Sequence, residues 1–149
     1  MMKLMTGDIL ESTCDAIVIP VTLKSVMGGG LALQAKQAHP EIFESYARWC
    51  NIPGVIPGDG IGIDVHKEDG TKQMYLCLST KDHWKYDSKL EWIERGVLIS
   101  IPKIMEQAKI KSIAVPKIGC GYGHLKWEDV FDILEKEIDA IAACKHIVG

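Results

Sequence analysis

Residues 73–80 read QMYLCLST, an apolar run without alternation, and Lys81-Asp82-His83-Trp84 follows it directly. A strand that is apolar on both sides indicates a sheet with both faces covered, because each face then packs against another layer. Similar short runs rich in β-forming residues predict further strands at Met2 to Met5, Asp15 to Val21, Gly60 to His66, Ser112 to Ile118 and Lys145 to Val148.

Helical spacing of apolar residues fills the segments between these strands. It predicts helices over Leu31 to Ala38 and Glu41 to Cys50, separated by Pro40, and a last helix from Trp127 to Ile141. A capping-box pattern, Ser88-Lys89-Leu90-Glu91, predicts that another helix starts at Ser88. Because Pro102 falls inside that helix, we expect a kink or a break near Leu98. Strands that alternate with helices predict one three-layer α/β/α domain over residues 1–149.

The composition restricts the classes of function. The chain has 149 residues, 47% of them hydrophobic and 25% charged, and no apolar run approaches the roughly 20 residues of a membrane span. A formal net charge of -3 argues against a surface that coats nucleic acid, although a local basic patch stays compatible with it. The N-terminal stretch MMKLMTGDIL has no apolar region or cleavage site of a secretory signal, so we expect a cytoplasmic protein without a membrane partner.

The five cysteines are scattered and have no metal-ligand spacing with one another or with histidine. They predict reduced, packed thiols rather than a zinc site or a structural disulfide. We therefore expect no metal and no cofactor.

Two glycine-rich loops follow predicted strands and precede predicted helices. The first contains Met27-Gly28-Gly29-Gly30, where backbone amides can approach a ligand closely and the next helix N-terminus favours an anion such as phosphate. The second runs from Pro116 to His124 through Gly119, Gly121 and Gly123, and such alternating glycines form an anion-binding nest. Either loop alone is equally compatible with a plain turn. Together they predict a clamp on one diphosphate, with Tyr122 placed to contact a sugar.

Ionisable residues near these loops are candidates for chemistry. Asp8, in a Gly-Asp-Ile turn, has a carboxylate that accepts from an exocyclic amine such as that of adenine, or only caps the turn. Lys81, at the end of its strand, is either a solvated cap or a nucleophile. His83 and His124 are candidates for proton transfer, with a purely structural role as the alternative.

These stretches resemble the macrodomain family, which binds ADP-ribose. The resemblance rests on Gly-Asp-Ile near the start, Asp-Ala-Ile-Val, Met-Gly-Gly-Gly-Leu-Ala, His-Pro-Glu-Ile-Phe-Glu-Ser-Tyr, Ser-Thr-Lys-Asp-His-Trp and Pro-Lys-Ile-Gly-Cys-Gly-Tyr-Gly-His-Leu-Lys-Trp. It implies an α/β/α macrodomain with a mixed central sheet of about six strands. Within the family, the lysine and second-glycine-loop motifs look like those of the DNA ADP-ribosyl glycohydrolase antitoxins (DarG-like), with the terminal ADP-ribose protein glycohydrolases as more distant cousins.

The resemblance also implies roles for particular residues. It places Asp8 on adenine, Lys81 as the catalytic lysine and both glycine loops on the diphosphate. The implied ligand-binding set is Asp8, Ile9, Thr22, Met27, Gly28, Gly29, Gly30, Pro116, Ile118, Gly119, Cys120, Gly121, Tyr122 and Gly123. Two positions depart from the family: Thr22 stands where most macrodomains carry an asparagine on the distal ribose, and the second loop lacks the aspartate of the protein-directed cousins.

From these residues we expect an ADP-ribosyl glycohydrolase that removes ADP-ribose from a modified substrate, most specifically a thymidine base in single-stranded DNA. Neutral Lys81 would attack the anomeric carbon, whereas charged Lys81 would stabilise the departing group. Two alternatives stay open. One is hydrolysis of ADP-ribose 1''-phosphate, and the other is a reader that binds ADP-ribose without catalysis.

Overall fold

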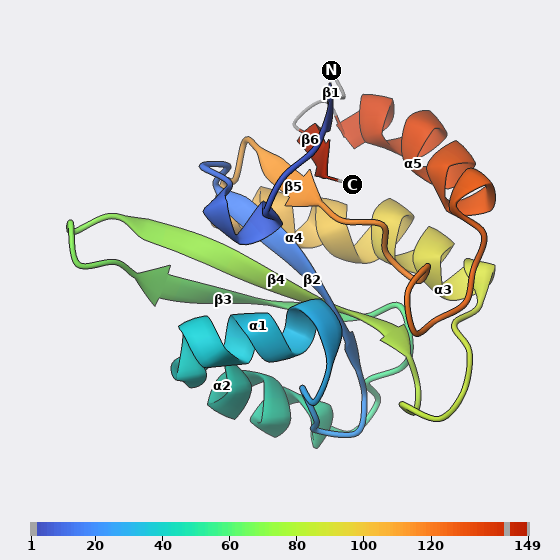
Figure 1. Cartoon of the computed structure of the whole chain (residues 1–149), viewed down its shortest axis with the longest axis horizontal. Helices are drawn as coiled ribbons and strands as arrows, with labels where there is room; N and C mark the ends of the chain where they lie inside the picture. Colours follow the sequence, from blue (N-terminus) through green and yellow to red (C-terminus); the bar gives the residue numbers. More distant parts are fainter. Residues whose placement is uncertain (1–2, 142–143, 149) are drawn as a thin grey trace.

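The computed structural model describes residues 3–141 and 144–148, which form a mixed six-stranded sheet with helices on both faces (Figure 1). The strand order is β1-β6-β5-β2-β4-β3, and every neighbouring pair is parallel except β3 and β4. The strands are β1 (Lys3–Met5), β2 (Ala16–Thr22), β3 (Gly60–His66), β4 (Lys72–Lys81), β5 (Ile113–Val115) and β6 (Cys144–Val148). The helical segments are η1 (Ile9–Glu11), α1 (Gly30–Ala38), α2 (Pro40–Cys50), α3 (Leu90–Arg95), η2 (Gly96–Ser100), α4 (Ile101–Ala108) and α5 (Trp127–Ile141).

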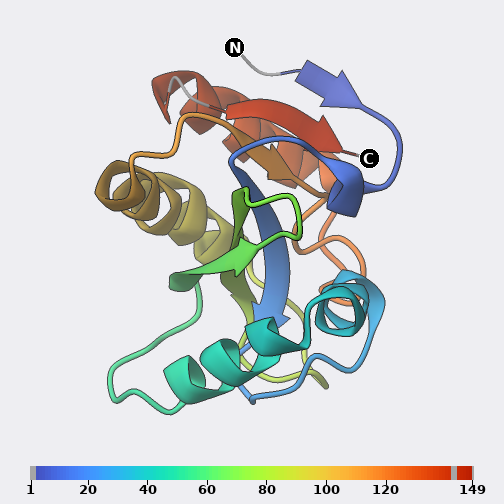
Figure 2. The same ribbon diagram turned by 90° about the vertical axis from the view of Figure 1, so that its left-hand side faces the viewer.

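Successive side chains of β2 pack into two different hydrophobic cores. Ala16 and Val18 belong to the core beneath α3, η2, α4 and α5, whereas Ile17 and Ile19 belong to the core beneath α1 and α2. The two views in Figures 1 and 2 show these helix groups on opposite faces of the sheet. The predicted three-layer α/β/α architecture, with a mixed sheet of about six strands, is therefore confirmed. Within the described residues, no helix is long and apolar enough to cross a membrane.

The predicted elements mostly lie at the expected positions, although Met2 is outside the described residues. The strand expected from Ser112 to Ile118 is shorter and ends at Val115, since Pro116 has no N–H to continue a ladder. Near Leu98, where a kink or a break is expected, the chain stays helical but changes its hydrogen-bond pattern: η2 is a π-helical turn in which Ile101 N–H donates to Gly96 O, and α4 then begins with Pro102 in its first turn.

The predicted capping box at Ser88 is wrong. Helix α3 begins at Leu90, with Lys89 as its N-cap and without a side-chain cap. Ser88 instead contacts the second glycine loop, since its N–H donates to Gly123 O at 3.0 Å. Its hydroxyl is buried without a hydrogen-bond partner.

The carboxyl ends of three adjacent parallel strands, β5, β2 and β4, meet at one edge of the sheet. The loops that follow them, residues 23–29, 82–89 and 116–126, therefore lie together at that edge (Figure 2). In open α/β sheets ligands bind outside this end of the strands, at the point where neighbouring connections diverge. The topology thus brings both glycine loops and Lys81 to one place.

Candidate functional site

A cavity of about 740 Å³ opens at this edge of the sheet. Its size falls in the range of pockets that hold a cofactor-sized ligand. The wall consists of the ends of β2 and β4, the start of α1 and the two glycine loops. Its lining residues are Pro20, Val21, Thr22, Val26, Met27, Gly28, Gly29, Gly30, Leu31, Ala32, Thr80, Lys81, Trp84, Pro116, Lys117, Gly119, Gly121, Tyr122 and Gly123.

Lys81 is the last residue of β4 and is only 7% exposed. The pairing of β2 with β4 shifts register between Val21 and Thr22, so that Thr80 is an extra residue and Lys81 pairs with Thr22. Such bulges commonly redirect a side chain beside a functional site. The solvated-cap reading of Lys81 is excluded by its burial, because a cap would place the amine in water.

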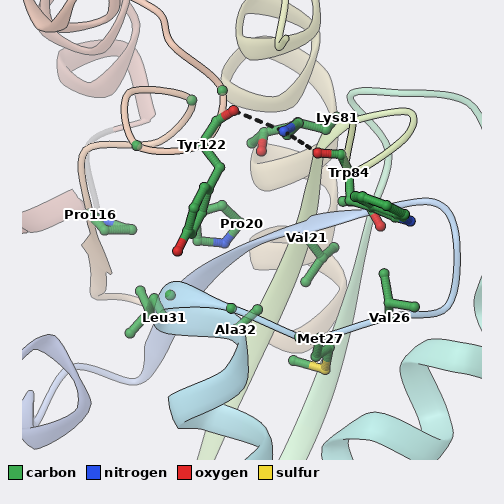
Figure 3. A pocket seen from close by; sticks show the side chains of 18 of the residues that line it. Pro20, Val21, Val26, Met27, Leu31, Ala32, Lys81, Trp84, Pro116 and Tyr122 are labelled. Carbon is green, nitrogen blue, oxygen red and sulfur yellow. Dashed lines mark hydrogen bonds between the residues drawn. The ribbon is translucent and has the colours of Figure 1, made fainter. Parts of the chain in front are cut away.

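The amine of Lys81 is held by two backbone carbonyls (Figure 3). Nζ donates to Tyr122 O at 2.8 Å and to Trp84 O at 3.0 Å. One partner belongs to the second glycine loop and the other to the loop that follows β4. Lys81 therefore fastens these two loops together at the cavity wall.

The first glycine loop leads directly into α1, whose N-cap is Gly29 and whose first residue is Gly30, at φ +56°. The ring of Tyr122 lies against this backbone: a Cβ added to Gly30 would stand 3.3 Å from Tyr122 Cε2. Glycine is needed here for the left-handed φ and for the seat of the ring. The first turn of α1 and the ring of Tyr122, from the second glycine loop, therefore line the same cavity.

The second glycine loop is closely packed against its neighbours and against itself. Gly119 has φ +76°, and a Cβ on Gly123 would collide with Ser88 Oγ and with the Gly119 backbone. Leu125 N–H donates to Gly119 O at 2.9 Å, and His124 N–H donates to Gly121 O at 3.1 Å. These bonds fold the loop into a compact turn.

Thr22 has a structural partner for its hydroxyl and for its carbonyl. Thr22 Oγ1 accepts from Lys24 N–H at 3.2 Å, while Tyr46 Oη donates to Thr22 O at 2.6 Å and also lies 3.2 Å from Val26 O. Burial raises the pKa of Tyr46 above its ordinary value, so the phenol stays a neutral donor. Tyr46 lies on the buried side of α2. From there it holds in place the segment that joins β2 to the first glycine loop.

The structure brings most of the predicted site residues together. The cavity is lined by Lys81, Thr22, Met27, Gly28, Gly29, Gly30, Pro116, Gly119, Gly121, Tyr122 and Gly123. Six predicted residues are outside the lining: Asp8, Ile9, Ile118, Cys120, His83 and His124. Ile9 and Ile118 are buried in the two cores, and Cys120 Sγ lies 3.5 Å from Ile118 O. The ligand and catalytic roles of these six residues stay predictions.

The three polar residues of this group already have partners. Asp8 caps η1, since its Oδ1 accepts from Leu10 N–H at 3.0 Å. His83 Nδ1 accepts from Lys85 N–H at 3.0 Å. His124 is exposed, and its Nδ1 lies 2.7 Å from Asp87 Oδ1.

Several lining residues escaped the sequence reasoning about the site. They are Pro20, Val21, Val26, Leu31, Ala32, Thr80, Trp84 and Lys117. All lie within a few residues of a predicted site residue, at a strand end or beside a glycine. Extending each motif to its flanking residues would have found them, but six of the eight have apolar or aromatic side chains that are equally typical of a core.

This mixed sheet, with a glycine-walled cavity beyond β2, β4 and β5, defines a macrodomain. Residues 18–134 match the Macro domain family, and the chain belongs to that family. Among its members, the chain is similar to DNA ADP-ribosyl glycohydrolases. It is 39% identical over 125 residues, 84% of its length, to the protein of that name from Mycobacterium tuberculosis, and 32% identical over 143 residues, 95% of its length, to that from Thermus aquaticus.

The chain spans only 35% and 39% of the length of these two relatives. Solved structures give the same affiliation. The macrodomain of M. tuberculosis DarG superposes with a TM-score of 0.90 at 33% identity, covering 99% of this chain and 96% of that one. Thermosipho africanus DarTG, solved in complex with ADP-ribose, superposes with a TM-score of 0.88 at 27% identity, covering 97% of this chain and 41% of that one.

Proposed function

We propose that this protein is an ADP-ribosyl glycohydrolase, which binds ADP-ribose in the cavity and removes it from a thymidine base of DNA. The observation that carries this proposal is the position of Lys81. It is a buried amine in the wall of a cavity that is also lined by two glycine loops suited to a diphosphate. The names of the similar proteins, DNA ADP-ribosyl glycohydrolases, support the choice of DNA as the substrate. The cytoplasmic location stays a prediction.

The charges around the cavity suit a diphosphate. Among the described residues, its lining contains two ionisable side chains, those of Lys81 and Lys117, and no carboxylate. The first-turn N–H groups of an α-helix have no partner within the helix, and they carry the positive end of its dipole. Helix α1 begins at Gly30 in this wall, so its amides provide donors for one phosphate. The turn at residues 119–123 provides donors for the other.

The two carbonyls that hold Lys81 leave it suited to either mechanism. A neutral amine has two N–H groups, so it can keep both hydrogen bonds, to Trp84 O and Tyr122 O, and still have a free lone pair. That lone pair would attack the anomeric carbon of the distal ribose. The C–N bond to lysine forms as the bond to the base breaks, and the base takes up a proton. The lysine nitrogen then loses a proton, the ribose ring opens to a Schiff base, and water releases ADP-ribose and restores the amine.

A charged Lys81 would keep the same two hydrogen bonds and direct its third N–H toward the departing atom. In this case water attacks the anomeric carbon directly. Reductive trapping distinguishes the two routes, since only the Schiff base is converted by borohydride into a stable adduct. An adduct on Lys81 supports the covalent route.

A non-catalytic reader is the second candidate, and Thr22 favours it. The hydroxyl of Thr22 accepts from Lys24 N–H, and the side chain has no amide to hold a ribose as an asparagine would. A reader would bind ADP-ribose with the same glycine loops but would release nothing from a modified substrate.

Calorimetry and a substrate panel test the proposal. Free ADP-ribose should bind, whereas AMP, which lacks the second phosphate, should bind more weakly. Incubation with ADP-ribosylated single-stranded DNA should release ADP-ribose, and ADP-ribosylated protein and ADP-ribose 1''-phosphate should react more slowly. Binding without release from any substrate would identify a reader. Failure to bind ADP-ribose would refute the proposed site.

A further inference from the structure

Exposed aromatic rings are confined to the surroundings of the cavity. Among the described residues with assigned burial, the exposed Trp, Tyr and Phe side chains are Trp84, Tyr86 and Tyr122, which are 55%, 68% and 70% exposed. The other Trp and Tyr side chains and both Phe are buried or partly buried. Tyr122 rests on the first glycine loop, so its position is explained by the cavity. Trp84 and Tyr86 project from the loop after β4 and need a different explanation.

The rings of Trp84 and Tyr86 form a cluster with that of His83. All three belong to the loop of residues 82–88, which we call the aromatic loop. The ring centroid of His83 lies 5.1 Å from that of Trp84 and 5.5 Å from that of Tyr86. Tyr86 N–H donates to His83 O at 3.1 Å, and Lys85 N–H donates to His83 Nδ1 at 3.0 Å. The rings are thus fixed by a tight turn before any partner binds, which lowers the entropy cost of stacking on them.

The aromatic loop is continuous with the reaction centre. Trp84 lines the cavity, and its carbonyl accepts from Lys81 Nζ at 3.0 Å (Figure 3). Tyr86 is two residues further along the loop and does not line the cavity. A chain that left the cavity past Trp84 would next meet Tyr86.

The charged groups of the loop leave one cation available to a phosphate-bearing partner. Asp82 pairs with Lys24 at 3.8 Å, and Asp87 pairs with His124 at 2.7 Å. Lys85 contacts the face of Trp84, with Nζ 5.3 Å from the ring centroid, and it forms no ion pair with any carboxylate of the described residues. Its ammonium is therefore available for a phosphate beside a stacked base.

We propose that the aromatic loop is the stacking surface for the single-stranded DNA that carries the modified base. Trp84 and Tyr86 receive unstacked bases, His83 holds the two rings apart, and Lys85 contacts the backbone. Every base has a flat π-face, so such stacking tolerates any sequence, whereas bases inside a duplex are already stacked on one another. This inference rests on the proposed DNA substrate and assigns the residues that recognise its strand.

Binding of an unmodified, fluorescently labelled thymidine oligonucleotide tests the stacking surface without catalysis. Tyr86→Ala should weaken the affinity roughly tenfold, within the range for loss of one stacked base. Tyr86→Phe should bind like the wild type, because the ring is kept. Leu98→Ala, at a 48% exposed residue of η2, is the matched control and should also bind like the wild type. Equal affinities for Tyr86→Ala and the wild type, or no binding by the wild type, would overturn the inference.

Kinetics separate this inference from the proposed function. Tyr86→Ala should raise KM for an ADP-ribosylated oligonucleotide but leave kcat and the hydrolysis of ADP-ribosylated thymidine unchanged. If the wild type hydrolyses the oligonucleotide and Tyr86→Ala has the same KM, the stacking surface is refuted and the glycohydrolase stands. If the wild type hydrolyses no substrate but Tyr86→Ala still weakens oligonucleotide binding, the proposed glycohydrolase activity is refuted and the stacking surface stands. If Tyr86→Ala raised KM only for an ADP-ribosylated peptide and not for the oligonucleotide, the choice of DNA as the partner would be overturned.

Discussion

Replacing Lys81 with methionine should destabilise the fold measurably, apart from any effect on catalysis. The thioether keeps most of the buried stem, but the two hydrogen bonds from Nζ to Tyr122 O and Trp84 O are lost. A hydrogen bond from a neutral donor contributes about 1 kcal/mol, and one from a charged donor about 1.5–3 kcal/mol. Because burying a charge offsets part of this gain, we expect Lys81→Met to lower the free energy of unfolding by about 2–4 kcal/mol.

Urea denaturation and thermal unfolding measure this effect. Each kcal/mol corresponds to about 2–4 °C in Tm for a domain of this size, so Tm should fall by roughly 4–16 °C. Lys85→Met is the matched control in the loop that follows Lys81, and an exposed substitution should change the free energy by less than about 0.5 kcal/mol. If Lys81→Met is as stable as Lys85→Met, Nζ does not fasten the two loops, and the argument for an aligned amine fails.

Two further changes test the loop packing and the buried core. Gly123→Ala should weaken ADP-ribose binding in calorimetry by roughly tenfold or more, because the new Cβ collides with Ser88 Oγ and displaces the loop; Leu98→Ala, at an exposed residue outside the cavity lining, should bind like the wild type. Unchanged affinity in Gly123→Ala would contradict this packing. Burial raises the pKa of Cys77 to about 12 from 9.0, so as pH rises above about 9 the unfolded chain loses this proton and the folded chain keeps it. The free energy of unfolding should therefore fall with rising pH, by up to about 1.4 kcal/mol per unit from this group, and Cys77→Ala should flatten the profile measured by urea denaturation. An identical slope in the variant would refute a buried, neutral Cys77.

The fold could be predicted from the sequence because local and tertiary preferences agree. The apolar runs of β2 and β4 pack on both faces, so a simple hydrophobicity argument found them. Ser88 shows where this reasoning failed. Its capping pattern is local, but the contact that decides its position is the distant Gly123 carbonyl, and no local pattern predicts that contact.

The site was predictable only in part for a related reason. The glycine loops and Lys81 have unusual sequences at strand ends, and strand order then brings them together. Asp8 follows the edge strand β1, which two strands separate from β2 in the sheet, and its carboxylate caps η1 outside the cavity lining. The sequence left open whether Trp84 is a core residue or contacts a substrate base, since sequence alone does not show that the loop after β4 leaves this residue 55% exposed.

The release of ADP-ribose from an ADP-ribosylated single-stranded oligonucleotide tests the central claim most directly. The wild type and Lys81→Met are compared at a temperature at which unfolding measurements show both to be folded, and with calorimetry to confirm that both bind ADP-ribose. We predict rapid release by the wild type and at least about a hundredfold slower release by Lys81→Met, since loss of a nucleophile or of leaving-group stabilisation typically costs that much. Equal rates for the two forms would contradict the assignment of Lys81 as the catalytic residue.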